Sequence, residues 1–96
     1  MSAFDERMAQ LRARFVVRAA EQREQLTAAL MAGDRDEVRR LAHGLSGSAG
    51  VFGFPEISVD AQAVEEAVDE GASDEELKPL ASKLLDRLAA ASQDAD

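Results

Sequence analysis

The chain has 96 residues, enough for one domain that buries a single thin core and encloses no deep pocket. It contains no cysteine, which excludes disulfides, thiolate metal sites and cysteine nucleophiles. The formal net charge is −8, and an acidic chain without a basic face is poorly suited to a phosphate backbone, so we expect no nucleic-acid partner.

The charge is spread unevenly along the chain. Residues 1–50 carry eight basic and seven acidic side chains, whereas residues 51–96 carry three basic and twelve acidic ones. We interpret the acidic half of the chain as a surface that faces solvent. The alternative is that its negative charge steers a binding partner toward the protein. The N-terminus lacks a signal-peptide pattern and no apolar run approaches the ~20 residues of a membrane span, which predicts a cytoplasmic protein with no membrane contact. The abundance of alanine and arginine favours a bacterial source.

The first predicted helix covers residues 4–32, because apolar side chains recur at steps of three and four. This stripe consists of Phe4, Met8, Leu11, Phe15, Ala19, Leu26 and Leu30. Gln22 interrupts the stripe and marks a place for a bend. Gly33 is suited to a C-terminal cap, and Asp34 to the N-cap of the next helix.

A second helix is predicted over residues 35–51, with a stripe of Val38, Leu41, Ala42, Leu45 and Ala49 that extends to Phe52. The third helix opens at Pro55, since proline suits the first helical position, and ends at Gly71. Its stripe consists of Ile57, Ala61, Val64 and Val68.

The fourth helix follows Ser73, which forms a capping-box pattern with Glu76. Its stripe consists of Leu77, Leu80, Leu84, Leu88 and Ala91. Pro79 falls inside it and predicts either a kink or a delayed start. Residues 92–96 are expected to fray. Four amphipathic helices with short connections predict an all-α, antiparallel up-down four-helix bundle that forms a single domain over residues 1–96.

The stretch AHGLSGSAGVFG, residues 42–53, holds the only histidine of the chain, followed by glycines at intervals of three. Each glycine inside a helix costs about 1 kcal/mol relative to alanine. At about 100° per residue, His43 lies opposite Leu41 and Leu45 and therefore points to solvent. Its face also carries Asp36, Arg39, Ser46, Gly47 and Gly50, with Arg40 slightly to one side. The two glycines leave no side chain over the imidazole, so the pattern predicts access for another macromolecule.

Other interpretations of this stretch are less favoured. A lone exposed histidine is commonly an ordinary surface residue. Helix glycines can also serve close packing between helices, as we expect for Gly44, which does not share the face of His43, Gly47 and Gly50. We expect no metal site, because the chain has no second histidine and Asp36 is the only carboxylate at helical spacing on this face. A phosphate-cradling loop is not supported, since neither G-x-G-x-x-G nor a Gly-Lys pair occurs.

The same stretch resembles the signature of histidine-containing phosphotransfer (HPt) domains, in which a histidine is followed by leucine, a Lys-Gly pair, small residues and a later glycine. The matching positions are His43, Leu45, Gly47, Ser48, Ala49 and Gly53. The flanks GDRDEVRRLAH and AQAVEEA are also similar to the family, so the resemblance covers essentially the whole chain. One position departs from it: Ser46 stands where the family usually has lysine.

The resemblance implies a phosphocarrier that is not an enzyme in its own right. HPt domains take a phosphoryl group from the aspartyl phosphate of a receiver domain and pass it to another receiver, in a response regulator or a hybrid histidine kinase. They have no ATP site, and this sequence likewise shows no nucleotide-binding pattern. We therefore expect His43 to be phosphorylated, at Nε2 if the family is followed. We expect no cofactor on this chain, with Mg²⁺ and the aspartate supplied by the receiver, and a monomeric state.

The departure at Ser46 bears on this function, because the missing lysine would help to neutralise the phosphoryl group. Arg39 and Arg40 lie one turn before His43 and can substitute in part, since guanidinium groups hold phosphate oxygens well. We expect the receiver to dock on the second helix and part of the first or third, with apolar contacts near Val51 and Phe54. The alternatives are a helical module that binds a receiver or kinase without carrying phosphate, which Ser46 favours, and a homodimeric structural bundle.

Overall fold

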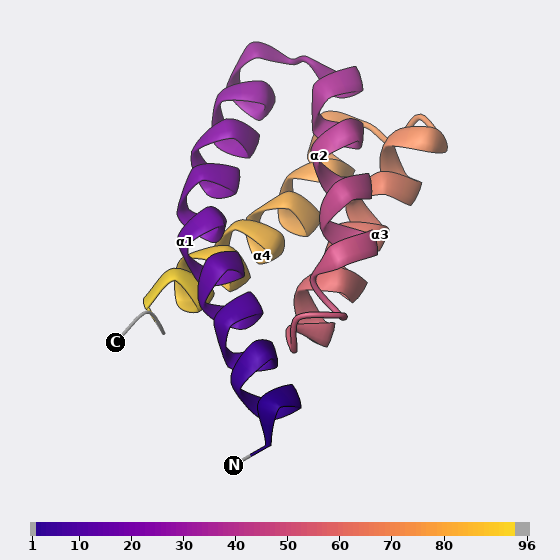
Figure 1. Ribbon diagram of the computed structural model, residues 1–96. Coiled ribbons are helices and arrows are strands. Elements are labelled where there is room, and N and C mark those ends of the chain that lie inside the picture. The colour runs from indigo at the N-terminus through magenta and orange to yellow at the C-terminus, as the bar shows by residue number, and fades with distance from the viewer. Residues whose placement is uncertain (1, 94–96) are drawn as a thin grey trace.

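The computed structural model describes residues 2–93, which form four α-helices and no strand (Figure 1). The helices are α1 (Ala3–Ala32), α2 (Arg35–Ser48), α3 (Pro55–Asp69) and α4 (Asp74–Gln93). Figure 1 shows α2 running against the direction of α1, and α3 against that of α2. Each helix packs against the next, and α4 also packs against α1. The all-α bundle that the sequence predicts is confirmed, and no helix within residues 2–93 is both long and apolar enough to cross a bilayer.

The predicted helix ends at Gly33, Asp34 and Ser73 are confirmed. Gly33 adopts a left-handed conformation with φ +68° after α1, and the Asp34 side chain accepts a hydrogen bond from the amide of Glu37 at 3.2 Å. Ser73 Oγ accepts a bond from the Glu76 amide and donates to the Glu76 carboxylate, both at 3.2 Å. The Asp34 and Ser73 side chains satisfy backbone donors that a helix start would otherwise leave open, whereas the amide of Gly33 donates to carbonyl oxygens at the end of α1.

A delayed start of the last helix, one of the two effects predicted for Pro79, does not occur. α4 begins at Asp74 and continues through Pro79. The capping box fixes the first turn, and burial of Leu77 holds it against the core, so one lost backbone hydrogen bond does not move the start. Of the segment predicted to fray, Ser92 and Gln93 belong to α4, and residues 94–96 lie outside the described residues.

The prediction that the second helix extends to residue 51 is wrong. α2 ends at Ser48, and the chain then turns, with the amide of Phe54 donating to the carbonyl of Ala49 at 2.9 Å. Gly53 permits this turn because its φ is +90°, a conformation that glycine adopts without steric cost. The turn brings Phe52 and Phe54 beside Phe15, with ring centroids 5.9 and 4.9 Å from that ring.

The core runs along the inside of all four helices and contains most of the predicted stripes. Its largest fully buried side chains are Leu26, Leu84, Leu88, Val38 and Val64. Phe4, predicted as part of the first stripe, is instead 70% exposed, because the N-terminal turns of α1 extend beyond the other helices (Figure 1). The only buried charged side chain among the described residues is Asp60, which binds Arg87 Nε at 3.1 Å.

Candidate functional site

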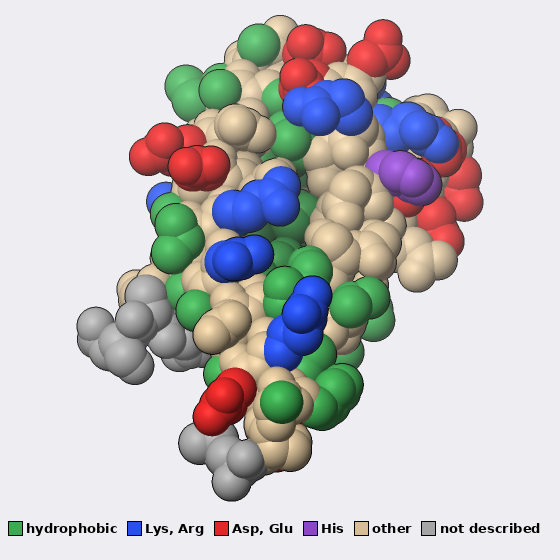
Figure 2. Space-filling model, in the orientation of Figure 1, with side chains coloured by type: hydrophobic (Ala, Val, Ile, Leu, Met, Phe, Trp, Pro, Cys, Tyr) green, Lys and Arg blue, Asp and Glu red, His purple; other side chains and the backbone are tan. Residues whose placement is uncertain are grey.

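His43 lies in the middle of α2 on its solvent side. Its side chain is 70% exposed, whereas Leu41 and Leu45 on the opposite side of the helix are buried. The predicted outward orientation of the imidazole is therefore confirmed. Figure 2 shows the histidine at the surface of the molecule, with no side chain covering it in that view.

The imidazole is held from one side by Glu65 of α3, a residue that the sequence analysis did not identify. His43 Nδ1 lies 2.8 Å from Glu65 Oε2, and the Glu65 side chain is only 14% exposed. A carboxylate accepts hydrogen bonds and does not donate, so we assign the proton of the neutral ring to Nδ1. Nε2 then keeps its lone pair and has no hydrogen-bond partner among residues 2–93.

Arg39 extends this contact into a row of alternating charges between α2 and α3. Its Nε donates to Asp69 Oδ1 at 2.5 Å, and its Nη2 lies 3.5 Å from Glu65 Oε2. The hydrogen bond to Asp69, together with the charges of Asp69 and Glu65, raises the pKa of the Arg39 guanidinium above its usual value. Arg39 thus stays cationic and holds the Glu65 carboxylate in position against His43.

The other predicted site residues lie around the imidazole without touching it. Arg40 pairs with Glu37 on its own helix and lines a hollow between α1 and α2, on the opposite flank from Arg39. Ser46 is half-buried, and its hydroxyl donates to the carbonyl oxygen of His43 at 2.8 Å. The structure therefore separates the two arginines that the sequence places together, one toward α3 and one toward α1.

The glycines that follow His43 differ in the space around them, and two predictions about them need correction. A Cβ added at Gly47 or at Gly44 would meet no atom within 4 Å apart from its own helix backbone, so the prediction that Gly44 serves close helix packing is wrong. The prediction that Gly50 continues the bare face of the second helix is wrong, because Gly50 lies in the turn after α2, where an added Cβ would make ordinary contact with Ser58 Cβ at 3.7 Å. The α2 face thus stays bare next to the imidazole.

Of the two apolar residues that we expect to contact the receiver, Val51 and Phe54, only Val51 is exposed. Val51 is 65% exposed and lies in the turn that follows α2. Phe54 is half-buried, because its ring stacks on Phe15 and is covered by the Arg12 guanidinium at 4.5 Å. Phe54 therefore closes the edge of the core rather than offering a free contact.

Comparison with known families decides what kind of domain carries this exposed histidine. A model of the Hpt domain family matches residues 10–94, nearly the whole chain. The chain belongs to the Hpt domain family. Hpt domains are phosphotransfer modules of two-component signalling that act as phosphocarriers rather than kinases and interact with receiver domains. No curated protein and no solved structure matched the sequence.

Sequence reasoning missed Glu65 because its role depends on which helix lies beside α2. The only local signal is that Glu65 follows the buried Val64 and so borders the apolar stripe of α3. That position puts a carboxylate at the edge of a helix contact, but it does not say which residue it faces. Within residues 2–93, no group of three histidine or acidic side chains is placed to hold a metal ion.

Proposed function

We propose that this Hpt domain relays a phosphoryl group between receiver aspartates through phospho-His43. The observation that supports it best is the exposed imidazole whose Nδ1 is bound to Glu65 while Nε2 has no partner among the described residues. Phosphoryl transfer needs an accessible, aligned nucleophile and compensation of charge more than elaborate covalent machinery. The exposed imidazole supports the first requirement, and the cationic side chain of Arg39 on the α3 side supports the second.

The proposed step begins with the Nε2 lone pair attacking the phosphorus of a receiver's aspartyl phosphate. The bond between phosphorus and the carboxylate oxygen breaks, the aspartate leaves with its electron pair, and an N–P bond forms. The ring then carries positive charge with its proton still on Nδ1, where the Glu65 carboxylate 2.8 Å away offsets that charge. Attack by the aspartate of a second receiver reverses the step and restores the neutral imidazole.

The residues around the ring take separate roles in this proposal. Gly47 keeps the approach to Nε2 clear. Arg39 offers the nearest cation on the α3 side, and Arg40 meets the receiver on the α1 side. Ser46 contributes no charge, because serine is uncharged, and its hydroxyl proton is donated to the carbonyl oxygen of His43. The receiver supplies the aspartate and its Mg²⁺, so this chain requires no cofactor of its own. The cysteine-free composition suits the cytoplasm of a bacterium as the place of this exchange.

The direct test is incubation of the chain with radiolabelled, phosphorylated receiver domains from the same cell. Label should move to the chain within the lifetime of the donor, and the product should be acid-labile and base-stable, as an N–P bond is. Receivers that bind the chain without labelling it would support the phosphate-free interaction module instead. That alternative draws its support from Ser46, which leaves the phosphoryl group without the family's usual lysine.

Glu65→Ala should lower the rate of phosphotransfer by about tenfold to a hundredfold, because a misaligned nucleophile loses much of the benefit of positioning. Glu65→Gln should restore most of this rate, since its amide oxygen can still accept a hydrogen bond from the Nδ1–H group. The rate is measured by following label from a phosphorylated receiver to the chain at a fixed receiver concentration.

Glu66→Ala is the matched control for Glu65→Ala, because Glu66 is exposed on the same helix and, within residues 2–93, its side chain accepts a hydrogen bond from Gln62 alone. Nitrogen NMR of His43 gives a second readout: the proton should favour Nδ1 in the unaltered chain and lose that preference in Glu65→Ala. An unchanged rate together with an unchanged tautomer would show that Glu65 does not position the ring.

Ser46→Lys should slow the loss of phosphate from phospho-His43 by about two- to fivefold, the range of an exposed ion pair. The added ammonium lies on the α3 flank of His43 and attracts the phosphoryl oxygens. The half-life of the isolated phosphoprotein is the measured quantity. Ser82→Lys adds the same charge at an exposed position of α4 and serves as the control. Equal half-lives for the two variants would mean that position 46 does not reach the phosphoryl group.

A further inference from the structure

Two polar pairs, one helical turn apart, join α2 to α3 at the site. Arg39 and His43 are four residues apart on α2, and so are Glu65 and Asp69 on α3. Residues at this spacing share one face of a helix. Glu65 contacts His43, and Asp69 accepts two hydrogen bonds from Arg39, at 2.5 and 3.4 Å. The site thus includes a second carboxylate, Asp69, whose hydrogen bonds go to the arginine and not to the imidazole.

Stability of the fold does not account for Asp69. It is the last residue of α3, at the end of a helix that carries partial negative charge, where a carboxylate is unfavourable. The side chains of Arg39 and Asp69 are both about half exposed, at 45% and 47%. Ion pairs as exposed as this one contribute little to stability. The main effect of the pair is therefore on where the Arg39 guanidinium lies.

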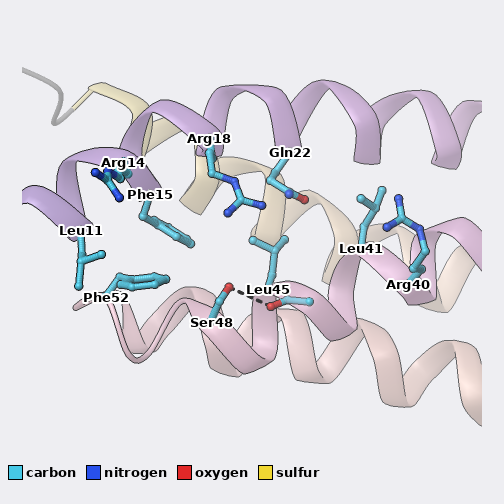
Figure 3. Close-up of a pocket in the computed structure, with 11 residues that line it drawn as sticks. Leu11, Arg14, Phe15, Arg18, Gln22, Arg40, Leu41, Leu45, Ser48 and Phe52 are labelled. Carbon is cyan, nitrogen blue, oxygen red and sulfur yellow. Dashed lines mark hydrogen bonds between the residues drawn. The ribbon is translucent and has the colours of Figure 1, made fainter.

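Arg39 is the arginine placed to hold a phosphoryl group on the α3 side. It lies one helical turn before His43, so its long side chain can reach a group bound at Nε2, and its Nη2 is 3.5 Å from the Glu65 oxygen that binds the ring. Arg40 instead lines the hollow between α1 and α2 (Figure 3). Asp69 occupies the Nε and Nη2 edge of Arg39, one of the edges with which a guanidinium holds two oxygens of an anion at once.

We propose that Asp69 is a positioning residue that withholds Arg39 from phospho-His43 and so keeps the phosphoryl group transient. This inference rests on the proposed function, since it concerns the same phosphorylated histidine. The phosphoryl group carries about two negative charges and competes with the Asp69 carboxylate for one guanidinium. Ser46 acts in the same direction, because it supplies no charge. A loosely held phosphoryl group suits a relay, since the domain must give it up to the next receiver.

The test uses the full chain phosphorylated at His43 with phosphoramidate, so that no receiver is needed. This small donor transfers its phosphoryl group to the imidazole nitrogen, and ammonia leaves with the electrons of the broken N–P bond. The half-life of phosphate on the isolated protein is compared for the unaltered chain and for Asp69→Asn, which removes the charge and changes the shape little. Glu70→Gln is the matched control, because it makes the same carboxylate-to-amide change at the next residue, which is exposed and makes no ion pair within residues 2–93.

Asp69→Asn should lengthen the half-life by about threefold to tenfold, and Glu70→Gln by less than about 1.5-fold. The lengthening should disappear when Asp69→Asn is combined with Arg39→Gln and compared with Arg39→Gln alone, because the effect passes through the guanidinium. A lengthening that persists in that background would show direct repulsion between the carboxylate and the phosphoryl group and would overturn the inference. Equal half-lives for Asp69→Asn and the unaltered chain would overturn it as well.

NMR of the Arg39 Nε–H group gives a readout on the unphosphorylated chain. Its bond to Asp69 should make this proton exchange with water several times more slowly than in Asp69→Asn, and equal exchange rates would show that Asp69 does not hold the guanidinium. The proposed function can fail separately. Receivers that pass no label to a chain with the expected half-lives would overturn the relay and uphold the role of Asp69, whereas normal labelling with unchanged half-lives would do the reverse.

Discussion

His43→Gln is expected to abolish transfer of label from a phosphorylated receiver to this chain. The amide nitrogen of glutamine has no available lone pair for attack on phosphorus, so the N–P bond cannot form. The fold should be unaffected, because the imidazole is 70% exposed and its one side-chain hydrogen bond within residues 2–93 is to Glu65, to which the glutamine amide can still donate. We expect the free energy of unfolding to change by less than about 0.5 kcal/mol.

The experiment compares label on the unaltered chain and on His43→Gln after equal exposure to the same phosphorylated receiver. His43 is the only histidine in the sequence, so acid-labile, base-stable label on the variant would have no histidine to account for it. Calorimetric binding of the unphosphorylated receiver to both proteins provides the control and should agree within about twofold. A variant that still takes up label as the unaltered chain does would place the phosphorylated residue elsewhere.

Gly47→Gln is expected to separate stability from function. Gly47 lies one helical turn after His43, and a Cβ there would meet no neighbouring atom within 4 Å, so the longer side chain does not disturb packing. Glutamine also has a better helix propensity than glycine, by something under about 1 kcal/mol. The Tm should therefore rise by up to about 4 °C. The side chain stands in the space over the imidazole that a receiver must enter, so phosphotransfer should fall by at least about tenfold.

A smaller substitution at the same position separates the effect of helix propensity from the effect of side-chain length. Gly47→Ala gains helix propensity while adding a single carbon, so it should raise the Tm and keep most of the transfer rate. Thermal unfolding followed by circular dichroism and the rate of labelling are measured on both variants. A less stable Gly47→Gln variant that transfers phosphate at the normal rate would show that this glycine serves packing and not access.

The helices and the outward orientation of His43 could be predicted because both follow from local periodicity. Apolar residues at steps of three and four place Leu41 and Leu45 on one side of α2, and His43, two residues from each of them, must then lie on the other side. Capping signals at Gly33 and Ser73 depend on neighbouring residues alone and are confirmed for the same reason. Local periodicity does not predict burial at the N-terminal turns of α1. Phe4 continues the apolar stripe but remains exposed, because these turns extend beyond the other helices.

The contacts of the site depend on how the helices are aligned with one another, which local periodicity does not encode. Glu65 meets His43 from 22 residues further along the chain because α3 packs beside α2 at one particular register. The same packing sends Arg39 toward α3 and leaves Arg40 lining the hollow between α1 and α2, although the two are adjacent in sequence. Sequence by itself determined the helices, their apolar faces and the exposed histidine. Only the tertiary structure decided which charges surround it, because those contacts join residues whose proximity arises from burial of the shared core.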